Sequence, residues 1–213
     1  MSTQSQPSTE KRDARAKLLA AALRVVRAKG YSATSIDDLC REAGVTKGAF
    51  FHHFASKSAL AVAAAAHWSD TTGALFDGAP FHAHADPLDR VLGYIDFRMT
   101  LLTGDVADFT CLVGTMVQEV FDADPEIRAA CDASISDHAR KLEADIAGAM
   151  GTCKIEAGWT AESLALHAQA VLQGAFILAK AKGGPEVAAD SIAHLRRYVE
   201  FLFHRPSKKE RPQ

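Results

Sequence analysis

The side chains with the clearest chemistry lie in the stretch KGAFFHH, residues 47–53. If Phe50 faces the core of a short helix, Lys47, Gly48, Phe51 and His52 point to solvent. Packing alone poorly explains a helix that exposes an ammonium, a bare glycine, an aromatic ring and an imidazole. The same groups suit insertion into the major groove of DNA, where donors read base edges and small residues permit close approach. The stretch is therefore a candidate recognition helix.

Two short helical patterns joined by a tight turn position this stretch. Either Thr34 or Ser35 can cap the first helix, because an Asp lies three residues after each and can complete a capping box. Gly44 follows at the place where a left-handed C-terminal cap is needed, and Thr46 can cap the second helix. The spacing predicts a helix-turn-helix.

At these residues the chain resembles the DNA-binding domain of the TetR family of bacterial transcriptional regulators. That family carries the spacing I..L...AGV..G..Y.HF..K..L, and about a dozen positions are in register here. One departure is Phe51, which replaces the more usual Tyr and lacks the hydroxyl that often reaches a phosphate. The matching positions are Ile36, Leu39, Ala43, Gly44, Val45, Gly48, Phe51, His53, Phe54, Lys57 and Leu60.

The resemblance implies which residues contact DNA. Lys47 is the best candidate for reading a base, as a donor to guanine acceptors. Lys57 matches a lysine that reaches a phosphate in the family, whereas Asp37 is an unfavourable neighbour for phosphate. The full set of expected DNA contacts is Ser35, Thr46, Lys47, Gly48, Phe51, His52 and Lys57.

The formal net charge of −2 conceals an uneven distribution. Residues 1–60 hold ten Lys and Arg against five Asp and Glu, whereas the remaining residues hold 14 against 21. The basic part is the part that carries the helix-turn-helix, as expected for a DNA-binding segment. No long apolar run or leader sequence is visible, and the four cysteines are widely spaced. We therefore expect reduced thiols, a cytoplasmic location and no membrane partner.

Helical periodicity continues through the whole chain and predicts an all-α fold of about nine helices. We expect a DNA-binding domain with an N-terminal arm over residues 1–56 and a helical ligand-binding and dimerisation domain over residues 57–204. The basic residues 205–213 are expected to form a disordered tail. The last two long helices are apolar on more than one face, and in the family this pair forms the dimer.

The second domain is expected to hold a cavity for a small-molecule effector. Arg98 would favour an anionic or carboxylate ligand if it faces inward, although a solvated position is an equal alternative. His138 lies on an apolar face, either as a core imidazole or as a polar anchor in the cavity. The expected lining residues are Tyr94, Phe97, Arg98, Cys111, Met116, Glu119, His138, Gln173 and Phe176.

The sequence thus predicts a homodimeric, ligand-responsive repressor of a pseudo-palindromic DNA operator. An activator of the same architecture remains open, because that difference lies in the position of the operator. A second alternative is a thiol or electrophile sensor acting through Cys111, since a thiolate is stabilised at a helix N-terminus. A helical enzyme is disfavoured, because no catalytic triad, paired carboxylates or phosphate loop is present. We expect no cofactor and no metal, and the pair His82 and His84 lacks identifiable further ligands.

Overall fold

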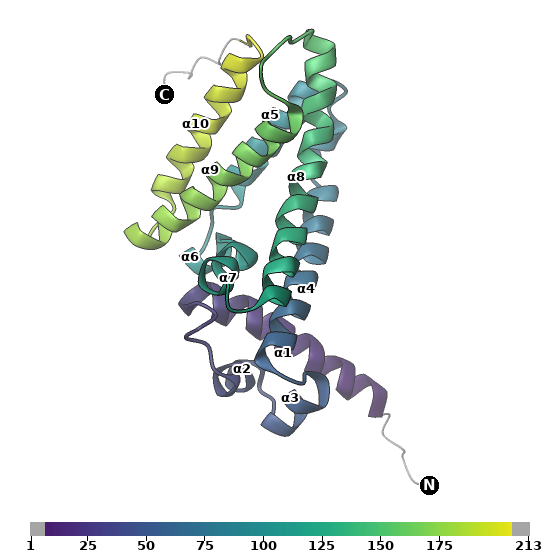
Figure 1. The fold of residues 1–213 in the computed structure, drawn as a ribbon, viewed down its shortest axis with the longest axis vertical. Coiled ribbons are helices and arrows are strands. Elements are labelled where there is room, and N and C mark those ends of the chain that lie inside the picture. Colours follow the sequence, from purple (N-terminus) through teal and green to yellow (C-terminus); the bar gives the residue numbers. More distant parts are fainter. Residues whose placement is uncertain (1–6, 206–213) are drawn as a thin grey trace. The chain divides into compact units, whose positions relative to one another are not determined.

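The computed structural model describes the backbone of residues 7–205 and the side chains of residues 13–205. Every regular element in this range is a helix, which confirms the predicted all-α class (Figure 1). The described residues form ten α-helices and one 3-10 helix, so the expectation of about nine was close. Residues 1–6 of the predicted arm and residues 206–213 of the predicted tail lie outside the described residues, whereas Arg205, the first residue of the predicted tail, is ion-paired with Asp86 and Asp89.

Contacts between residues divide the chain into two compact units. The first unit contains the described residues up to Thr72 together with Thr110–Ser134, and the second contains Gly73–Phe109 and the residues from Ile135 onward. Two long helices contribute residues to both units: α4, Lys57–Asp77, and α8, Pro125–Cys153. The segment 110–134 therefore packs with the N-terminal helices, a grouping that the sequence did not predict.

The first unit is built on helix α1, Pro7–Lys29, which packs against three short helices. These are α2, Ile36–Ala43, α3, Lys47–His53, and α7, Leu112–Val120. The core is made of fully buried apolar side chains from several of these elements, and burial of each contributes about 1.5–3 kcal/mol. Its largest members are Leu18, Leu39, Phe50, Leu60, Leu112 and Met116.

The second unit centres on helix α10, Glu186–Leu202, which packs against both α9, Ala161–Lys182, and α5, Pro87–Thr100. The 3-10 helix η1, Pro80–Ala83, covers α5, and the short helix α6, Val106–Phe109, contacts α9. Helix α6 has only one turn and no hydrophobic periodicity, which explains why the sequence did not predict it.

Capping residues set the ends of helix α9. Thr160 and Ser163 form a reciprocal capping box at its start, and Gly183 adopts a left-handed φ of 75° at its end. Among the described residues α9 is the one helix long and apolar enough to cross a membrane by length and composition. A core helix of a folded protein has the same properties, and α9 packs on α10.

Candidate functional site

The first helix of the helix-turn-helix is fixed by a capping box at Ser35. Its hydroxyl accepts from the Asp38 amide at 3.1 Å, and the Asp38 carboxylate accepts from the Ser35 amide at 3.0 Å. Lys29 also donates to this carboxylate at 2.5 Å. Hydrogen bonds from Lys29 and Ser35 hold the pKa of Asp38 well below its usual range. The structure therefore decides between the two predicted caps in favour of Ser35, while Thr34 is buried.

The turn and the second helix also follow the sequence pattern. Gly44 closes α2 in the left-handed conformation, with φ 63° and ψ 36°. Thr46 then caps α3, because its side chain accepts from the Ala49 amide at 3.1 Å. Phe50 is fully buried and anchors α3 in the core of the first unit. The α3 helix is thus held rigidly by its own cap and by one aromatic anchor.

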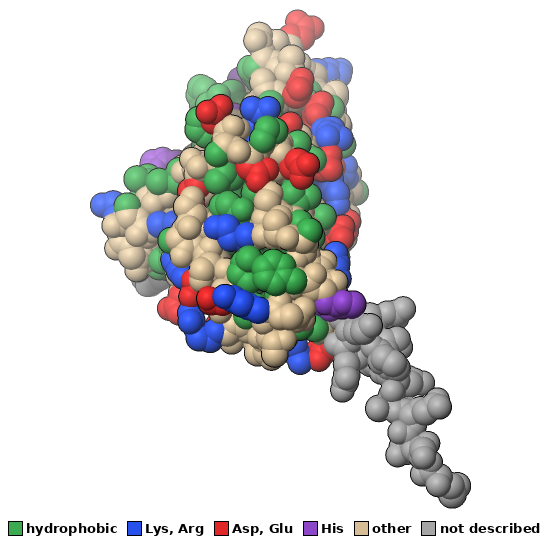
Figure 2. Space-filling view, turned by 60° about the horizontal axis from the view of Figure 1, so that its bottom comes forward, with side chains coloured by type: hydrophobic (Ala, Val, Ile, Leu, Met, Phe, Trp, Pro, Cys, Tyr) green, Lys and Arg blue, Asp and Glu red, His purple; other side chains and the backbone are tan. Residues whose placement is uncertain are grey.

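Four predicted contact residues of α3 lie on its solvent face: Lys47, Gly48, Phe51 and His52 are all exposed. Phe51 is 55% exposed, a large apolar surface for a ring outside a core. Lys47 forms an exposed ion pair with Asp37 at 2.8 Å, and this hydrogen bond raises the pKa of Lys47. Basic, acidic and hydrophobic side chains are interspersed on the face seen in Figure 2. A base contact by Lys47 therefore competes with the Asp37 carboxylate for the ammonium group.

Gly48 is not required by packing inside the protein. A Cβ built at Gly48 would meet only the Thr46 Oγ1 atom, at 3.7 Å, which is an ordinary contact. A glycine in a helix costs about 0.5–1 kcal/mol relative to alanine. A residue that lowers helix stability without a reason in the fold is consistent with close approach of an external surface.

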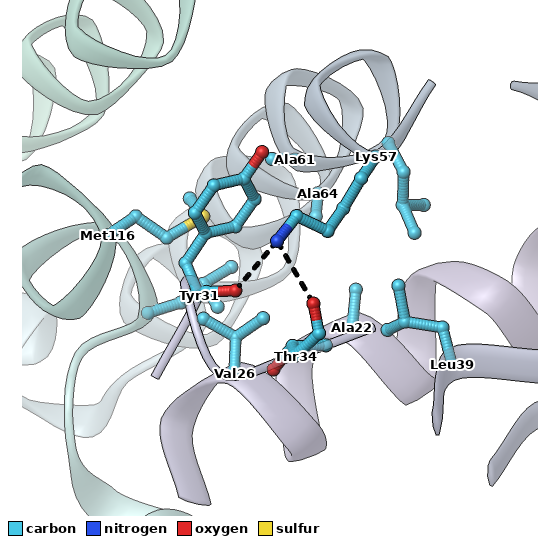
Figure 3. Close-up of a pocket in the computed structure, with 11 residues that line it drawn as sticks. Ala22, Val26, Tyr31, Thr34, Leu39, Lys57, Ala61, Ala64 and Met116 are labelled. Atoms are coloured by element: carbon cyan, nitrogen blue, oxygen red, sulfur yellow. Dashed lines mark hydrogen bonds between the residues drawn. The ribbon is translucent and has the colours of Figure 1, made fainter. Parts of the chain in front are cut away.

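Lys57 lies at the start of α4, with its ammonium turned toward the loop before α2. It donates to the backbone oxygens of Tyr31 at 3.1 Å and Thr34 at 3.0 Å (Figure 3). The ammonium also lies 4.2 Å from the centre of the Tyr31 ring. Burial lowers the pKa of Lys57, and the charge of Glu119 partly opposes this. The predicted phosphate contact of Lys57 stays a prediction, since two of its three donors are used within the first unit.

Glu119 holds the same loop from helix α7. Its carboxylate accepts from the Tyr31 amide at 3.0 Å and from the Ser32 amide at 2.7 Å. The approach is close because Gly30 has no side chain: a Cβ there would lie 2.5 Å from Oε1 of Glu119, and its φ is 90°. Glu119 was expected to line the ligand cavity, and in this structure its carboxylate binds the loop instead.

Three of the predicted ligand residues meet in the second unit. The Tyr94 hydroxyl lies 2.9 Å from Nε2 of His138, and Arg98 donates to the same hydroxyl and to the same ring nitrogen at 2.9 and 2.6 Å. Gln169, which the sequence did not single out, is buried and donates to the Tyr94 hydroxyl at 3.2 Å. We call Tyr94, Arg98, His138 and Gln169 the polar cluster.

A small cavity of about 30 Å³ adjoins the polar cluster. Tyr94 and His138 line it together with three apolar side chains, those of Phe76, Phe81 and Leu142. The predicted lining residue Phe97 packs edge-on against Phe76, with ring centres 5.2 Å apart. The remaining residues around the cavity are Asp77, His82, Lys141 and Asp145.

His138 is kept neutral by its surroundings. Burial is the first cause and the Arg98 charge the second, and together with Lys141 they lower the pKa of His138 to about 3, against a small opposing effect of Asp77. A neutral imidazole whose Nε2 faces the Arg98 donor carries its proton on Nδ1. The sequence had left open a core imidazole or a polar anchor, and the structure shows an imidazole that borders a cavity.

The other predicted ligand residues are not gathered at this cavity. Cys111 and Met116 belong to the first unit, where Met116 is fully buried and lines a second, smaller cavity of about 10 Å³ beside Lys57 (Figure 3). Phe176 packs against Phe109 in the second unit, with ring centres 6.4 Å apart. Gln173 is half-buried on α9, one turn after Gln169. Their roles in ligand binding stay predictions.

The histidines of the loop before α5 have contacts that do not form a metal site. The Nε2 atom of His82 lies 3.0 Å from the backbone oxygen of Phe76. Within the part of the chain that the structure describes, no group of three or more His, Cys, Asp or Glu side chains is arranged to hold a metal ion.

The helix-turn-helix is capped at both helices and exposes a lysine, a glycine and an aromatic ring on its second helix. These features are typical of a DNA-binding regulator. Comparison with protein families agrees: residues 18–64 match the model described as bacterial regulatory proteins, tetR family. Residues 87–195 match the tetracyclin repressor-like C-terminal domain. These matches cover most of the chain, which belongs to the TetR family of transcriptional regulators.

Two curated relatives resemble part of the chain. The transcriptional regulator AcuR of Cereibacter sphaeroides is 28% identical over 113 residues, 53% of this chain and 52% of the relative. The HTH-type transcriptional repressor NemR of Escherichia coli (strain K12) is 29% identical over 125 residues, 56% of this chain and 60% of the relative. The chain therefore spans less than two thirds of the length of these relatives.

Solved structures show the same fold over nearly the whole chain. A TetR-family regulator from Agrobacterium tumefaciens matches with a TM-score of 0.77 and 19% identity, covering 92% of this chain and all of the other. The reduced form of E. coli NemR matches with a TM-score of 0.74 and 22% identity, covering 87% and 96% of the two chains. At this identity the likeness establishes the architecture.

Proposed function

We propose that this protein is a homodimeric, cytoplasmic transcriptional repressor that binds a pseudo-palindromic operator and is released by a small-molecule effector. The observation that carries the DNA-binding part is the solvent face of α3, where Lys47, Gly48, Phe51 and His52 are exposed on a helix anchored by Phe50. An activator would use the same architecture, since the position of the operator relative to the promoter decides between the two.

The contact residues have two kinds of role. Lys47 reads a base edge in the major groove after it exchanges its Asp37 partner for the DNA. Thr46, Phe51 and His52 fix the register of α3 on the phosphates, with Ser35 adding a contact from the start of α2. Lys57 can supply its third ammonium donor to a phosphate. These roles follow from exposure, charge and the family pattern.

The dimer is formed by helices α9 and α10. Among the described residues, five of the eight exposed large hydrophobic side chains lie on these two helices, and Phe201 is the most exposed at 75%. A surface of this kind usually marks a protein interface. Two-fold symmetry then places two recognition helices on half-sites about 34 Å apart or a multiple of that distance. The five side chains are Leu166, Ile177, Leu178, Tyr198 and Phe201.

An effector bound in the second unit acts on DNA binding through α4. This helix contributes residues to both units, and its residues 61–66 are alanines except for Val62, with Ala61 and Ala64 buried. A shift of α4 would change the distance between the two recognition helices, which must match a fixed half-site spacing. The effector can shift this equilibrium only by its difference in affinity for the two states.

The first test is fluorescence anisotropy of a duplex that carries the palindrome nearest the gene, measured over a salt series. We expect specific binding that weakens steeply with salt and falls at least about tenfold in Lys47→Ala. Arg140→Ala removes a positive charge from an exposed position of α8, outside both the helix-turn-helix and the proposed dimer helices, and should bind as the wild type. Absence of binding to any duplex at low salt would refute the proposal.

Thiol sensing through Cys111 is the second candidate, and one observation favours it. The half-buried Sγ atom caps helix α7 and accepts from the Gly114 amide at 3.4 Å. In this alternative an electrophile modifies Cys111 and releases the protein from DNA. Cys111→Ser should then keep DNA binding and lose release by the electrophile, whereas unchanged release would exclude this role.

A further inference from the structure

Arg98 differs from the other half-buried arginines of the second unit. Arg90 pairs with Asp145, Arg196 pairs with Asp96, and Arg205 pairs with Asp86 and Asp89. Within residues 13–205, Arg98 forms no ion pair: its hydrogen-bond partners are Tyr94 and His138, both neutral side chains. The three paired arginines are Arg90, Arg196 and Arg205.

A half-buried cation without a counter-ion is costly, because burial removes water and no carboxylate replaces it. The Arg98 charge acts on its surroundings, since it helps to keep His138 neutral. Its guanidinium also lies 4.2 Å from the centre of the Phe76 ring, a contact that compensates a cation only in part. The polar cluster therefore has an uncompensated positive charge.

The guanidinium keeps donors available. Nε of Arg98 donates to the Tyr94 hydroxyl, and Nη2 donates to this hydroxyl and to Nε2 of His138. Nη1 has no hydrogen bond to any described residue. Gln169 donates to the Tyr94 hydroxyl, and that hydroxyl faces Nε2 of His138, so the free donor of the cluster is Nη1 of Arg98. The planar guanidinium group can donate two parallel hydrogen bonds to the two oxygens of one anion. Carboxylate and phosphate are the common anions that fit this geometry.

The adjoining cavity distinguishes these two anions. Its apolar wall consists of Phe76, Phe81 and Leu142, which suits a hydrocarbon tail. Asp77 and Asp145 also line it, and each is already paired with a cation, Lys141 and Arg90 respectively. Because both of these cations are already paired, Arg98 offers a single positive charge, which balances a monocarboxylate but only half the charge of a phosphate dianion.

We propose that the polar cluster is the recognition point for a small organic monocarboxylate, with the carboxylate on Arg98 and the apolar tail in the cavity beside Tyr94 and His138. This rests on the proposed function, because it names the effector class of that regulator. A cavity of about 30 Å³ holds about two water molecules, so the ligand must widen it. Widening gives the ligand different affinities for two states, which is the condition for release from DNA.

The test is isothermal titration of the full-length protein with straight-chain monocarboxylates from propionate to hexanoate and with benzoate. Each acid is paired with its primary amide, which has the same shape and no charge. We expect at least one acid to bind and its amide to bind at least about tenfold more weakly. In Arg98→Gln the acid should lose at least about tenfold in affinity, while Arg140→Gln, an exposed charge change on α8, should bind as the wild type.

Anisotropy on the operator duplex, with the same preparations, separates this proposal from the proposed function. A protein that binds DNA but no carboxylate, or binds acid and amide equally, would refute the carboxylate site and leave the regulator standing. Equal binding of the acid by Arg98→Gln and wild type would also refute it. If Arg98→Gln does not fold, Arg98→Lys, which keeps the positive charge, is measured in its place. The ratio of the wild-type affinities for the acid and its amide then still decides whether the site recognises a carboxylate.

Discussion

Glu119 of α7 binds the backbone amide of Tyr31 at 3.0 Å, so a side chain from the middle of the chain holds the loop that leads into the helix-turn-helix. The same carboxylate binds the Ser32 amide, and Lys57 holds two carbonyl oxygens of this loop from its other side. The loop between α1 and α2 is thus fixed by two opposite charges from two helices. This arrangement makes the position of α2 depend on α7.

Removing the Glu119 carboxylate should loosen this loop. Because the carboxylate is exposed, we expect Glu119→Ala to lower the free energy of unfolding by only about 1 kcal/mol, measured by urea denaturation. The affinity for the operator should fall about fivefold. Glu119→Gln keeps one acceptor oxygen, so its stability and affinity should lie between those of the wild type and Glu119→Ala. Asp122→Ala, an exposed carboxylate just after α7, is the control. Wild-type stability and affinity in Glu119→Ala would show that the contact has no role.

Gly48→Ala should separate stability from DNA binding. The added Cβ meets no atom closer than 3.7 Å in the protein. The free energy of unfolding should therefore stay the same or rise by up to about 0.5–1 kcal/mol, and the thermal midpoint should not fall. Operator affinity should nevertheless fall roughly tenfold, because the methyl group lies on the face that approaches DNA. Gly151→Ala adds a methyl group at an open site on α8 and should not change affinity. Unchanged affinity in Gly48→Ala would place the DNA elsewhere.

Phe201→Glu should weaken the dimer with little effect on the fold of each subunit. Its ring is 75% exposed on α10, so few contacts within the subunit are lost. An aromatic anchor in an interface contributes about 2 kcal/mol, so the dissociation constant should rise about thirtyfold in sedimentation velocity runs. Leu75→Glu changes an exposed side chain of α4 that is 48% exposed and should leave the dimer intact. A dimer as tight as the wild type in Phe201→Glu would move the interface away from α10.

His138 should make stability depend on pH in the acid range. Its pKa is lowered to about 3 in the folded state from 6.5, so the unfolded state binds more protons between these values. Stability is therefore full above pH 6.5 and falls as pH drops toward 3, by about 1.4 kcal/mol per pH unit at most. His138→Gln should lose about 2 kcal/mol less than the wild type between pH 6.5 and 5, measured by urea denaturation. His194→Gln, at an exposed position, is the control, and identical slopes for all three proteins would contradict the folded-state pKa.

Local chemistry made the helix-turn-helix predictable. The capping box at Ser35, the left-handed Gly44 and the Thr46 cap each depend on residues within four positions of one another. Helix periodicity likewise predicted most of the long helices, because a buried stripe recurs every three or four residues. The family resemblance at these residues gave the function class, and the family matches over residues 18–64 and 87–195 agree with it.

Only the tertiary structure decided which distant polar groups meet. Glu119 was expected at the ligand cavity but binds the amides of Tyr31 and Ser32. Glu119 and Tyr31 are 88 residues apart in the sequence, and helical periodicity does not predict such a distant contact. Gln169 joins Tyr94 across 75 residues, while Gln173, one turn later, does not. A helical pattern gives the face of a residue relative to its own axis. The rotation and packing of the helices against each other determine which partner that face meets, and this depends on the whole core.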